Sequence, residues 1–208
     1  MTRYGMLIDT KRCIACNTCT VGCKVENNLP EGMWYNRVVN VGGENPDSPS
    51  GKYTDGNLSM GAYTLACQHC SNPACVEVCP TGASWKDEET GIVLIDSDSC
   101  IGCGSCMKAC PYDVRQLQEG DPVSYTGFDM GGQGAPEHKA NVVEKCTFCA
   151  HRVVDGELPF CVTICPGRAR VFGDLDDPDS DVSRLLRERE NEQLLVEEGT
   201  EPNVYLLK

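Results

Sequence analysis

Apolar residues in this chain fall in short runs, each followed by a polar segment. One run, MLI, ends at Asp9, and a second, VLI, ends at Asp96, so each predicts a short strand followed by a loop. Apolar positions at helical spacing over residues 181–196, with Ser180 or Asp181 as N-cap, predict an amphipathic helix. The terminal NVYLLK predicts a further short strand. No run approaches the roughly 18 apolar residues of a spanning helix, so we expect no direct membrane span.

Two long polar segments separate these runs. Residues 40–60 and 119–140 are rich in Gly, Pro, Ser, Asn and Asp, which predicts long surface loops. Loops of this length are either partner-facing or tolerated insertions, and the sequence leaves both alternatives open. Trp34 and Trp85 are expected to be packing residues.

The 16 cysteines form four sets of four with none left over. The sets are Cys13, Cys16, Cys19 and Cys23; Cys67, Cys70, Cys75 and Cys79; Cys100, Cys103, Cys106 and Cys110; and Cys146, Cys149, Cys161 and Cys165. The first and third have the spacing C-x2-C-x2-C-x3-C, the other two lengthen the middle gap, and Pro follows the last cysteine in three sets. Three such thiolates can wrap one corner of a cubane. The fourth, one helical turn further on, points to a different cluster, as in the bacterial ferredoxin run.

Other uses of these cysteines fit less well. The cysteine content is close to that of a disulfide scaffold, but the chain exceeds the size of small secreted domains, and its first residues show no apolar signal segment. Structural zinc uses two Cys pairs separated by a longer loop, which only the fourth set resembles. Covalent haem needs C-x-x-C-H, and CTFCAH misses that pattern by one position. Iron–sulfur clusters are therefore the favoured cofactor.

An internal repeat supports duplication. MLIDTKRCIACNTC at residues 6–19 matches VLIDSDSCIGCGSC at 93–106 nearly position for position. Each pair of cysteine sets would build one two-cluster module of short strands and helices, an α+β fold. Since all four sets already hold four thiolates, His69 and His151 are expected to be donors that tune cluster potential. His138, within a loop, is expected to be exposed.

Charge and motifs exclude several functions. The net charge of −13 argues against nucleic acid and anionic lipid as partners. The sequence has no Rossmann or P-loop glycine pattern, and no nucleophile–base set stands out. We therefore expect no catalytic residues, and no enzyme activity of the chain on its own.

Nearly the whole chain resembles the four-cluster ferredoxin-type electron-transfer (beta) subunits of the dimethyl sulfoxide reductase superfamily of molybdopterin oxidoreductases. The segments that carry the resemblance are YGMLIDTKRCIACNTCTVGCKVENN, LACQHCSNPACVEVCPTGA, CIGCGSCMKACPYDVR, KCTFCAHR and GRARVFGDLDDPDSDVSRLL. They look most like the subunits that serve thiosulfate, polysulfide, arsenate and dimethyl sulfoxide reductases. The chain departs from the family pattern at Lys24, where Pro is expected.

This resemblance implies a crossed use of the cysteines. The implied ligand sets are Cys13, Cys16, Cys19 and Cys165 for cluster 1; Cys146, Cys149, Cys161 and Cys23 for cluster 2; Cys67, Cys70, Cys75 and Cys110 for cluster 3; and Cys100, Cys103, Cys106 and Cys79 for cluster 4. Because Cys103 is present, cluster 4 is expected to hold four irons, so the cofactors are four [4Fe-4S] clusters. The implied fold is two bacterial-ferredoxin-like modules with long loops and a C-terminal helix. One module is discontinuous (1–60 plus 141–208), and the other is continuous (61–140).

The implied function is electron relay between a large molybdopterin (Mo or W) catalytic subunit and a membrane quinol-oxidising subunit or soluble donor. Cluster 1 would lie near the catalytic subunit and cluster 4 at the far end, with Lys11, Arg12 and both long loops in or near interfaces. A free polyferredoxin, or the equivalent subunit of a formate dehydrogenase or hydrogenase, is the alternative. The complex is expected in the cytoplasm, or exported folded with a partner that carries a twin-arginine signal.

Overall fold

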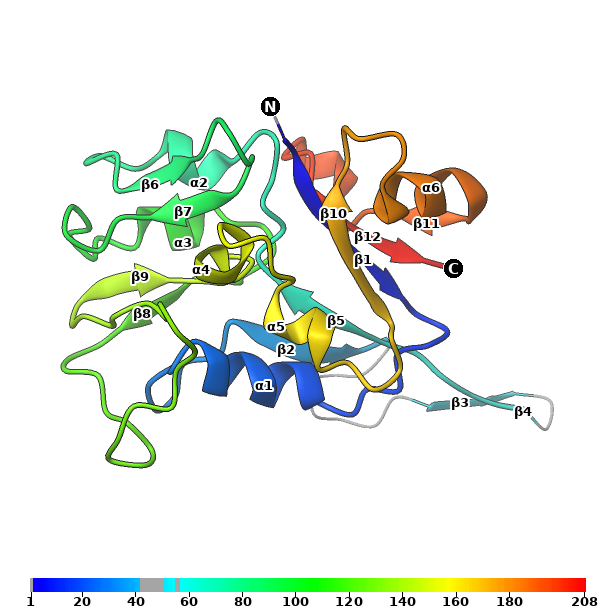
Figure 1. Cartoon of the computed structure of the whole chain (residues 1–208), viewed down its shortest axis with the longest axis horizontal. Coiled ribbons are helices and arrows are strands. Elements are labelled where there is room, and N and C mark those ends of the chain that lie inside the picture. The colour runs from blue at the N-terminus through cyan, green and yellow to red at the C-terminus, as the bar shows by residue number, and fades with distance from the viewer. Residues whose placement is uncertain (1, 42–50, 55–56) are drawn as a thin grey trace.

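The structure, a computed structural model, describes residues 2–41, 51–54 and 57–208. It is a mixed fold of small sheets and short helices (Figure 1). Its helices are α1 (Thr18–Glu26), α2 (Ala74–Glu77), α3 (Ser105–Lys108), α4 (Ala150–Val153), α5 (Phe160–Thr163) and α6 (Asp181–Glu188), with a 3-10 turn at Val196–Glu198. Its strands are β1 (Tyr4–Asp9), β2 (Asn36–Asn40), β3 (Gly51–Thr54), β4 (Asn57–Met60), β5 (Ala62–Ala66), β6 (Ser84–Lys86), β7 (Val93–Ile95), β8 (Gln116–Gln118), β9 (Val142–Glu144), β10 (Arg170–Asp174), β11 (Asn191–Glu192) and β12 (Val204–Leu207).

The largest sheet joins the two ends of the chain in the order β10-β1-β12-β11. β1 runs antiparallel to β10 and parallel to β12. Successive side chains of β1 point to opposite faces of the sheet. Since five consecutive residues of this strand are buried, both of its faces are covered. Met6 and Ile8 pack with Phe148 in one core cluster, while Leu7 packs on the other face against Val182 of α6. Figure 1 shows α6 beside this sheet, with the blue and red terminal strands together.

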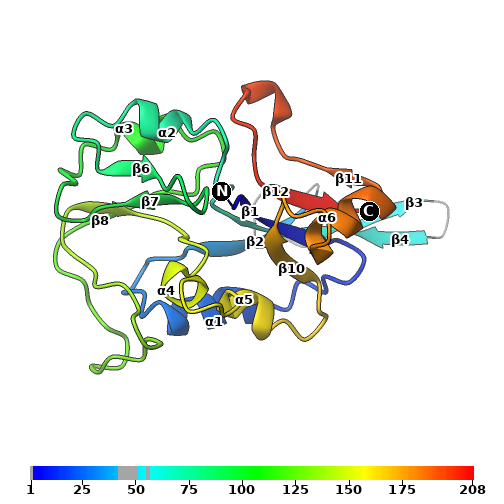
Figure 2. The same cartoon turned by 45° about the horizontal axis from the view of Figure 1, so that its top comes forward.

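Elements from corresponding places in different cysteine sets pack together. The strand before the first set, β1, pairs with the strand after the fourth, β10. Likewise the strand before the third set, β7, pairs with the strand after the second, β6. Helix α1 packs against α5, and α2 against α3, as the two views show (Figures 1 and 2). The arrangement repeats, as the internal sequence repeat predicts.

Two further strand pairs cross the predicted module boundaries. β2 pairs with β5, and β8 pairs with β9, both antiparallel. In each pair one strand falls within residues 1–60 or 141–208 and the other within 61–140. Hydrogen-bonded strands therefore connect the two parts of the chain where separate modules would have linkers.

The start of the C-terminal helix and the last strand are confirmed. Ser180 is the N-cap of α6, and its Oγ accepts from the Ser183 backbone N–H at 3.1 Å. The predicted end at 196 is wrong, because α6 stops at Glu188. Arg189 adopts extended backbone, and β11 then pairs with β12.

The loop predictions are partly confirmed. Residues 119–140 contain neither helix nor strand, as expected. Within 40–60, however, β3 and β4 pair as an antiparallel hairpin, so the loop prediction is wrong there. Residues 42–50 and 55–56 lie outside the described residues. Trp34 and Trp85, expected to be packing residues, are 39% and 41% exposed, so neither belongs to the buried core. Among the described residues, no helix is both long and apolar enough to cross a membrane.

Candidate metal centres

All four cysteine sets begin with the same backbone turn. The third residue of each Cys-x-x-Cys segment has a left-handed conformation: Ala15, His69, Gly102 and Phe148 have φ of 55°, 45°, 66° and 54°. Gly102 meets this requirement without strain. A Cβ at Gly102 would also lie 2.3 Å from the Asn141 carbonyl oxygen. Equal spacing in the sequence therefore gives the same left-handed turn in all four Cys-x-x-Cys segments, and we call this turn the cysteine hook.

The fourth cysteine is presented in two ways. In the three sets followed by Pro, the short helix ends before that cysteine, and the residue three positions after it is left-handed: Gly82, Asp113 and Arg168. In the first set Lys24 follows Cys23, and α1 continues to Glu26. Replacement of Pro by Lys thus lengthens this helix.

Twelve cysteines line three cavities. Each cavity has three cysteines from one set and the last cysteine of another, and Cys67 also lines the cavity of site 2. Site 1 is lined by Cys13, Cys16, Cys19 and Cys165; site 2 by Cys23, Cys146, Cys149 and Cys161; and site 3 by Cys67, Cys70, Cys75 and Cys110. We call Cys79, Cys100, Cys103 and Cys106 site 4. Within it, Cys79 is close enough to Cys103 to oppose ionisation of that thiol.

Burial controls the acidity of the inner thiols. In site 2, burial followed by the other three cysteines raises the pKa of Cys23 well above the ordinary thiol value. Burial likewise raises the pKa of Cys149 to about 11 and that of Cys70, in site 3, to about 12. Such thiols stay protonated at neutral pH unless a cation binds them, because a coordinating metal deprotonates its thiol ligands.

Two equivalent cysteines are exposed instead. Cys16 and Cys103 are the second cysteines of the first and third sets. Each has a hydroxyl two residues further on, with Thr18 Oγ1 3.2 Å from Cys16 Sγ and Ser105 Oγ 3.5 Å from Cys103 Sγ. These side-chain hydrogen bonds lower the pKa of both thiols. Sites 1 and 4 therefore each have one cysteine at the molecular surface.

Hydrogen-bond donors surround the other sulfurs. The backbone N–H of Ser84 donates to Cys79 Sγ at 3.3 Å, and that of Ala169 donates to Cys165 Sγ at 3.3 Å. Among the described residues, buried donor atoms without a partner include Asn36 Nδ2, which belongs to a residue of the site 2 lining, and Arg115 Nη1, from the site 3 lining. Unsatisfied buried donors fit a bound group that offers acceptors, and the inorganic sulfides of an iron–sulfur cluster do so.

Of the three histidines, only His138 differs from expectation. The side chain of His138 is only 6% exposed, so the prediction of an exposed residue is wrong. Its Nε2 donates to the Asn27 carbonyl at 2.8 Å, and its Nδ1 lies 2.7 Å from a Glu144 carboxylate oxygen. His151 contacts Glu26 at 3.1 Å. His69 stacks on a ring, and its Nδ1 accepts from the Val93 N–H at 3.2 Å. For His69 and His151, tuning of the clusters stays a prediction.

A single metal ion suits these sites poorly. All 16 cysteines are free thiols. In the part of the chain that the structure describes, no group of three or more His, Cys, Asp or Glu side chains could hold one metal ion. Zinc requires its four ligands around one atom, whereas the thiolates of a cubane bind separate irons. The cysteine cavities therefore fit clusters.

Sequence reasoning missed three cations close to the sulfurs. Arg170 lies 3.4 Å from Cys161 Sγ and 3.6 Å from Cys19 Sγ. Arg115 donates to Cys75 Sγ at 2.8 Å. Lys145, which directly precedes Cys146 in the sequence, is buried. A signal was present for two of them: CPYDVR and CPGRAR both place Arg five residues after the last cysteine of a set.

The fold and the cysteine sites together define an iron–sulfur electron-transfer protein. Comparison with known families agrees. Residues 59–124 and 134–175 match the 4Fe-4S dicluster domain family, and residues 10–28 match a 4Fe-4S binding domain. The 16 cysteines fit four [4Fe-4S] clusters.

Curated relatives extend the match over the whole chain. The chain is 49% identical to the iron-sulfur subunit of a putative dimethyl sulfoxide reductase from Halobacterium salinarum, covering 100% of this chain and 79% of that one. It is 37% identical to the arsenate respiratory reductase iron-sulfur subunit ArrB of a Shewanella species (99% and 96% covered). It is also 37% identical to a tetrathionate reductase subunit of Salmonella typhimurium (99% and 72% covered). The chain belongs to the family of iron–sulfur electron-transfer subunits of molybdopterin oxidoreductases, and is a non-catalytic subunit type.

Proposed function

We propose that the chain carries single electrons along a file of four clusters between a large molybdopterin catalytic subunit and a second redox partner. The observation that carries this proposal is the order of the sites. Arg170 lines both site 1 and site 2, and Cys67 lines both site 2 and site 3. Arg115 contacts Cys75 of site 3 and is near Cys106 of site 4. The sites therefore follow one another as 1, 2, 3 and 4, with exposed Cys16 and Cys103 at opposite ends.

The proposed ligands are the cysteines of the four sites as defined above. When bound, each [4Fe-4S] cluster accepts and returns one electron. The protein holds the thiolates, keeps every cysteine of sites 2 and 3 at least partly buried, and supplies donors such as Asn27 Nδ2, which lies 3.4 Å from Cys23 Sγ. We further propose that sites 1 and 2 belong to one ferredoxin-like module (1–60 plus 141–208), and that site 3 and site 4 belong to the other (61–140). The packing of α1 on α5 and of α2 on α3 supports this division.

Apolar side chains flank both ends of the file. Near Cys16 the exposed residues are Ile14, Val21 and Trp34, and the last two line a hollow of about 630 Å³. We call Ile14, Val21 and Trp34 the site 1 face, and propose that it binds the molybdenum or tungsten subunit. Exposed apolar groups of this kind mark interaction surfaces. Lys11 and Arg12, exposed beside Cys13, would lie at its edge.

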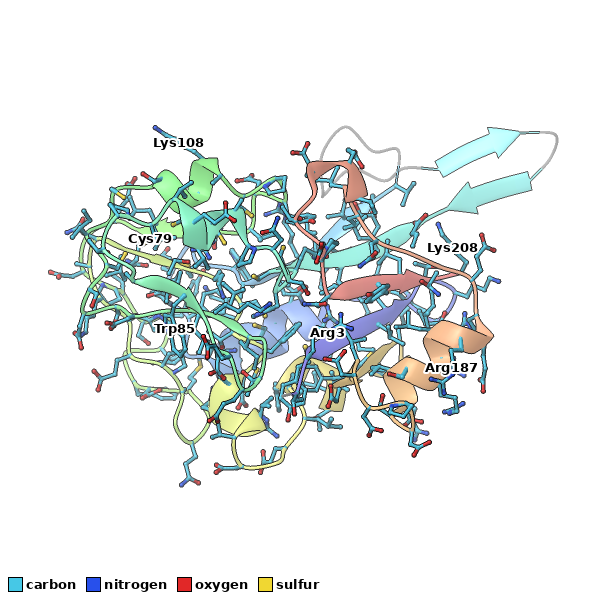
Figure 3. The ribbon with its side chains drawn as sticks, turned by 90° about the horizontal axis from the view of Figure 1, so that it is seen from above. Arg3, Cys79, Trp85, Lys108, Arg187 and Lys208 are labelled. Carbon is cyan, nitrogen blue, oxygen red and sulfur yellow. The ribbon has the colours of Figure 1, made fainter. Side chains whose placement is uncertain are left out.

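The opposite end has its own apolar residues. Val78, Trp85 and Ile101 are exposed, and Cys103 is exposed with them. Figure 3 shows Cys79, Trp85 and Lys108 far from Arg187 and Lys208. We call Val78, Trp85 and Ile101 the site 4 face, and propose that it binds the second partner, a membrane quinol-oxidising subunit or a soluble donor. The compartment follows the partner: a large subunit with a twin-arginine signal would carry this subunit across the membrane folded, and without that signal the complex stays in the cytoplasm.

Native purification tests the proposed function. Purified anaerobically, the chain is expected to contain about 16 irons and 16 acid-labile sulfides. It should elute from gel filtration with a much larger molybdenum or tungsten subunit, because stable interfaces bury roughly 1,200–2,000 Å². A free monomer that reduces several unrelated enzymes equally well would instead indicate a polyferredoxin. Stoichiometric zinc with little iron would exclude both functions.

A matched pair of variants tests the two faces. Trp34→Glu should release the large subunit and keep all the iron. Trp85→Glu should retain the large subunit and slow reduction by the second partner. If Trp85→Glu releases the large subunit and Trp34→Glu does not, the assignment of the faces is reversed.

One cysteine variant tests the crossed ligand sets. Cys23→Ser is expected to damage the cluster of site 2, whose other ligands are Cys146, Cys149 and Cys161, and to spare most of the cluster of site 1. Electron paramagnetic resonance of the reduced variant should show one altered signal. Loss of the site 1 cluster alone would show that the ligand sets are wrong.

A further inference from the structure

Three cationic side chains are buried among the cysteines. Arg115 and Lys145 are 2% exposed, and Arg170 is 6% exposed. In the described part of the chain none of them forms an ion pair with a carboxylate. An isolated buried cation is strongly unfavourable, so negative charge must lie nearby. The cysteine thiolates are the nearest source of it.

Arg170 lies between sites 1 and 2. Its Nη1 is 3.4 Å from Cys161 Sγ of site 2, and its Nη2 is 3.6 Å from Cys19 Sγ of site 1. Nη2 also donates to Asn36 Oδ1 at 3.1 Å, which fixes the orientation of the guanidinium. Burial opposes its charge, yet the pKa of Arg170 is raised by Cys161 and Cys19. A guanidinium stays charged in proteins, so Arg170 is a permanent charge that lies against both sites.

Arg115 occupies the corresponding position between sites 3 and 4. Its Nη2 donates to Cys75 Sγ at 2.8 Å and to Ser84 Oγ at 2.9 Å. Burial lowers its pKa, but Cys75, Cys67 and Cys106 more than offset this effect. Cys75 belongs to site 3 and Cys106 to site 4. Both arginines stand five residues after a fourth cysteine, so the repeat places one at each outer junction.

Lys145 lies at the middle junction, between sites 2 and 3. Its Nζ donates to the Cys146 carbonyl oxygen at 2.9 Å and also contacts the Val93 carbonyl. Cys67 and Cys75 of site 3 and Cys146 of site 2 lie close enough to interact electrostatically with its ammonium, although burial and the charge of Arg115 leave the pKa of Lys145 below its ordinary value. Two carbonyl acceptors and thiols from two sites surround it. Each of the three junctions in the file thus has one buried cation.

We propose that Arg170, Lys145 and Arg115 each hold a positive charge at one junction between consecutive clusters and raise the reduction potentials of both clusters that flank it. A cluster gains negative charge when it is reduced, so a nearby cation stabilises the reduced form more than the oxidised form. Because each cation is shared by two sites, it raises neighbouring potentials together and keeps an electron from being trapped on either side. This inference rests on the proposed ligand sets.

The test is a redox titration of the intact complex, followed by electron paramagnetic resonance. Arg170→Gln should lower the equilibrium constants for reduction of clusters 1 and 2 by about tenfold, or about 59 mV for a one-electron couple, and move clusters 3 and 4 much less. Arg115→Gln should lower the potentials of clusters 3 and 4 and move those of clusters 1 and 2 much less. Lys145→Met should lower the potentials of clusters 2 and 3. The signals are assigned with one variant per site: Cys16→Ser, Cys149→Ser, Cys70→Ser and Cys103→Ser.

Charge-conserving variants separate the role of charge from packing. Arg170→Lys and Arg115→Lys should recover most of each potential. Equal shifts in the Lys and Gln variants, shifts spread over all four clusters, or unchanged potentials would overturn the proposal. A neutral variant that loads iron incompletely is also informative. Loss of only the two clusters that flank the substituted cation supports the proposal, and loss of all four clusters in both arginine variants contradicts it. Failure of the proposed function would show separately, as wild-type protein without clusters.

Discussion

Lys24 occupies the position that holds proline in the other three cysteine sets. Its side chain turns inward, and its Nζ donates to the carbonyl oxygens of Pro30 at 2.7 Å and Met33 at 3.0 Å. The same Nζ lies 4.4 Å from the ring centroids of both Trp34 and Tyr125. A single residue thus ties the end of α1 to the following loop and to the loop at 119–140.

We expect Lys24→Met to lower the free energy of unfolding by about 2–3 kcal/mol, since hydrogen bonds from a charged donor are lost and two carbonyls are left without it. Guanidinium unfolding of the anaerobic holoprotein measures this loss. Lys108→Met is the control, because Lys108 is exposed at the end of α3, and it should change stability by less than about 0.5 kcal/mol. Equal effects of the two substitutions would show that the Lys24 contacts are not stabilising.

His138 should make stability depend on pH. Burial lowers its pKa, but the Glu144 carboxylate raises it by more, so the folded-state pKa lies above the ordinary value. A group whose pKa is raised by folding stabilises the protein fully below the unfolded-state pKa, and this contribution is lost as pH rises through the folded-state value. We therefore expect His138→Gln to be most destabilising in mildly acidic solution and least so above the raised pKa. Unfolding midpoints measured across this range check it.

Glu144 provides the second arm of that experiment. Glu144→Gln removes the carboxylate that raises the histidine pKa, so its unfolding midpoint should lose the same pH dependence. A His138→Gln variant whose deficit is constant with pH would show that the imidazole contributes by packing rather than by charge.

At the scale of elements, the four cysteine hooks share one backbone shape with different residues at the left-handed position. Gly102 and Ala15 are equivalent in the sequence repeat, yet only at Gly102 would an added Cβ come within 2.3 Å of a carbonyl oxygen, that of Asn141. The φ of 66° at Gly102 favours glycine, but the other hooks hold non-glycine residues at this position, so it is the close approach to the segment before β9 that requires glycine in the third set.

Gly102→Ala is expected to destabilise the protein by about 1–2 kcal/mol from the left-handed conformation alone, with more from the clash. The damage should centre on site 4, measured as loss of one cluster signal and of up to a quarter of the iron. Ala15→Gly is the matched control, and site 1 should keep its cluster. If both variants retain full iron and equal stability, the close approach at Gly102 is relieved at no cost.

Local signals in the sequence were sufficient for some elements and insufficient for others. The strand before Asp9, the Ser180 cap and the final strand follow from patterns within a few residues, and all three are found. The end of α6 depends on strand pairing between β11 and β12, which joins distant residues. The pairs β2–β5 and β8–β9 are long-range in the same way, so the short runs that form them carried no sign of their partners.

The candidate site shows the same division. Spacing alone grouped the cysteines into four sets, because each hook is local, whereas the crossed grouping into sites was implied only by the family resemblance. The cations were missed, because Arg115, Lys145 and Arg170 are residue types that normally lie at the surface. Only the arrangement of several distant segments makes them internal, and only the repeated Cys-Pro-x-x-x-Arg spacing could have indicated two of the three.

At the scale of the whole molecule, the proposed clusters connect segments that the chain separates widely. Site 1 joins Cys13 to Cys165, and site 2 joins Cys23 to Cys146. The elements that surround the sites are small: α2 and α5 have no buried residue, and in α3 only Cys106 is buried. Helices of four residues do not persist in water by themselves. We therefore expect clusters bound to the cysteines of these helices to supply most of their stability.

Removal of iron should therefore unfold most of the chain, since metal-binding free energy becomes folding free energy when the ligands come from distant segments. We expect anaerobic chelation to remove most of the far-ultraviolet circular dichroism. Hydrogen exchange should show loss of protection at the cysteine hooks and their short helices. Protection should last longest in β1, β10, β12 and α6, where Leu7, Val182 and Leu207 form a core without cysteine. An apo-protein that keeps native circular dichroism and uniform protection would show that the polypeptide, and not its clusters, holds these segments together.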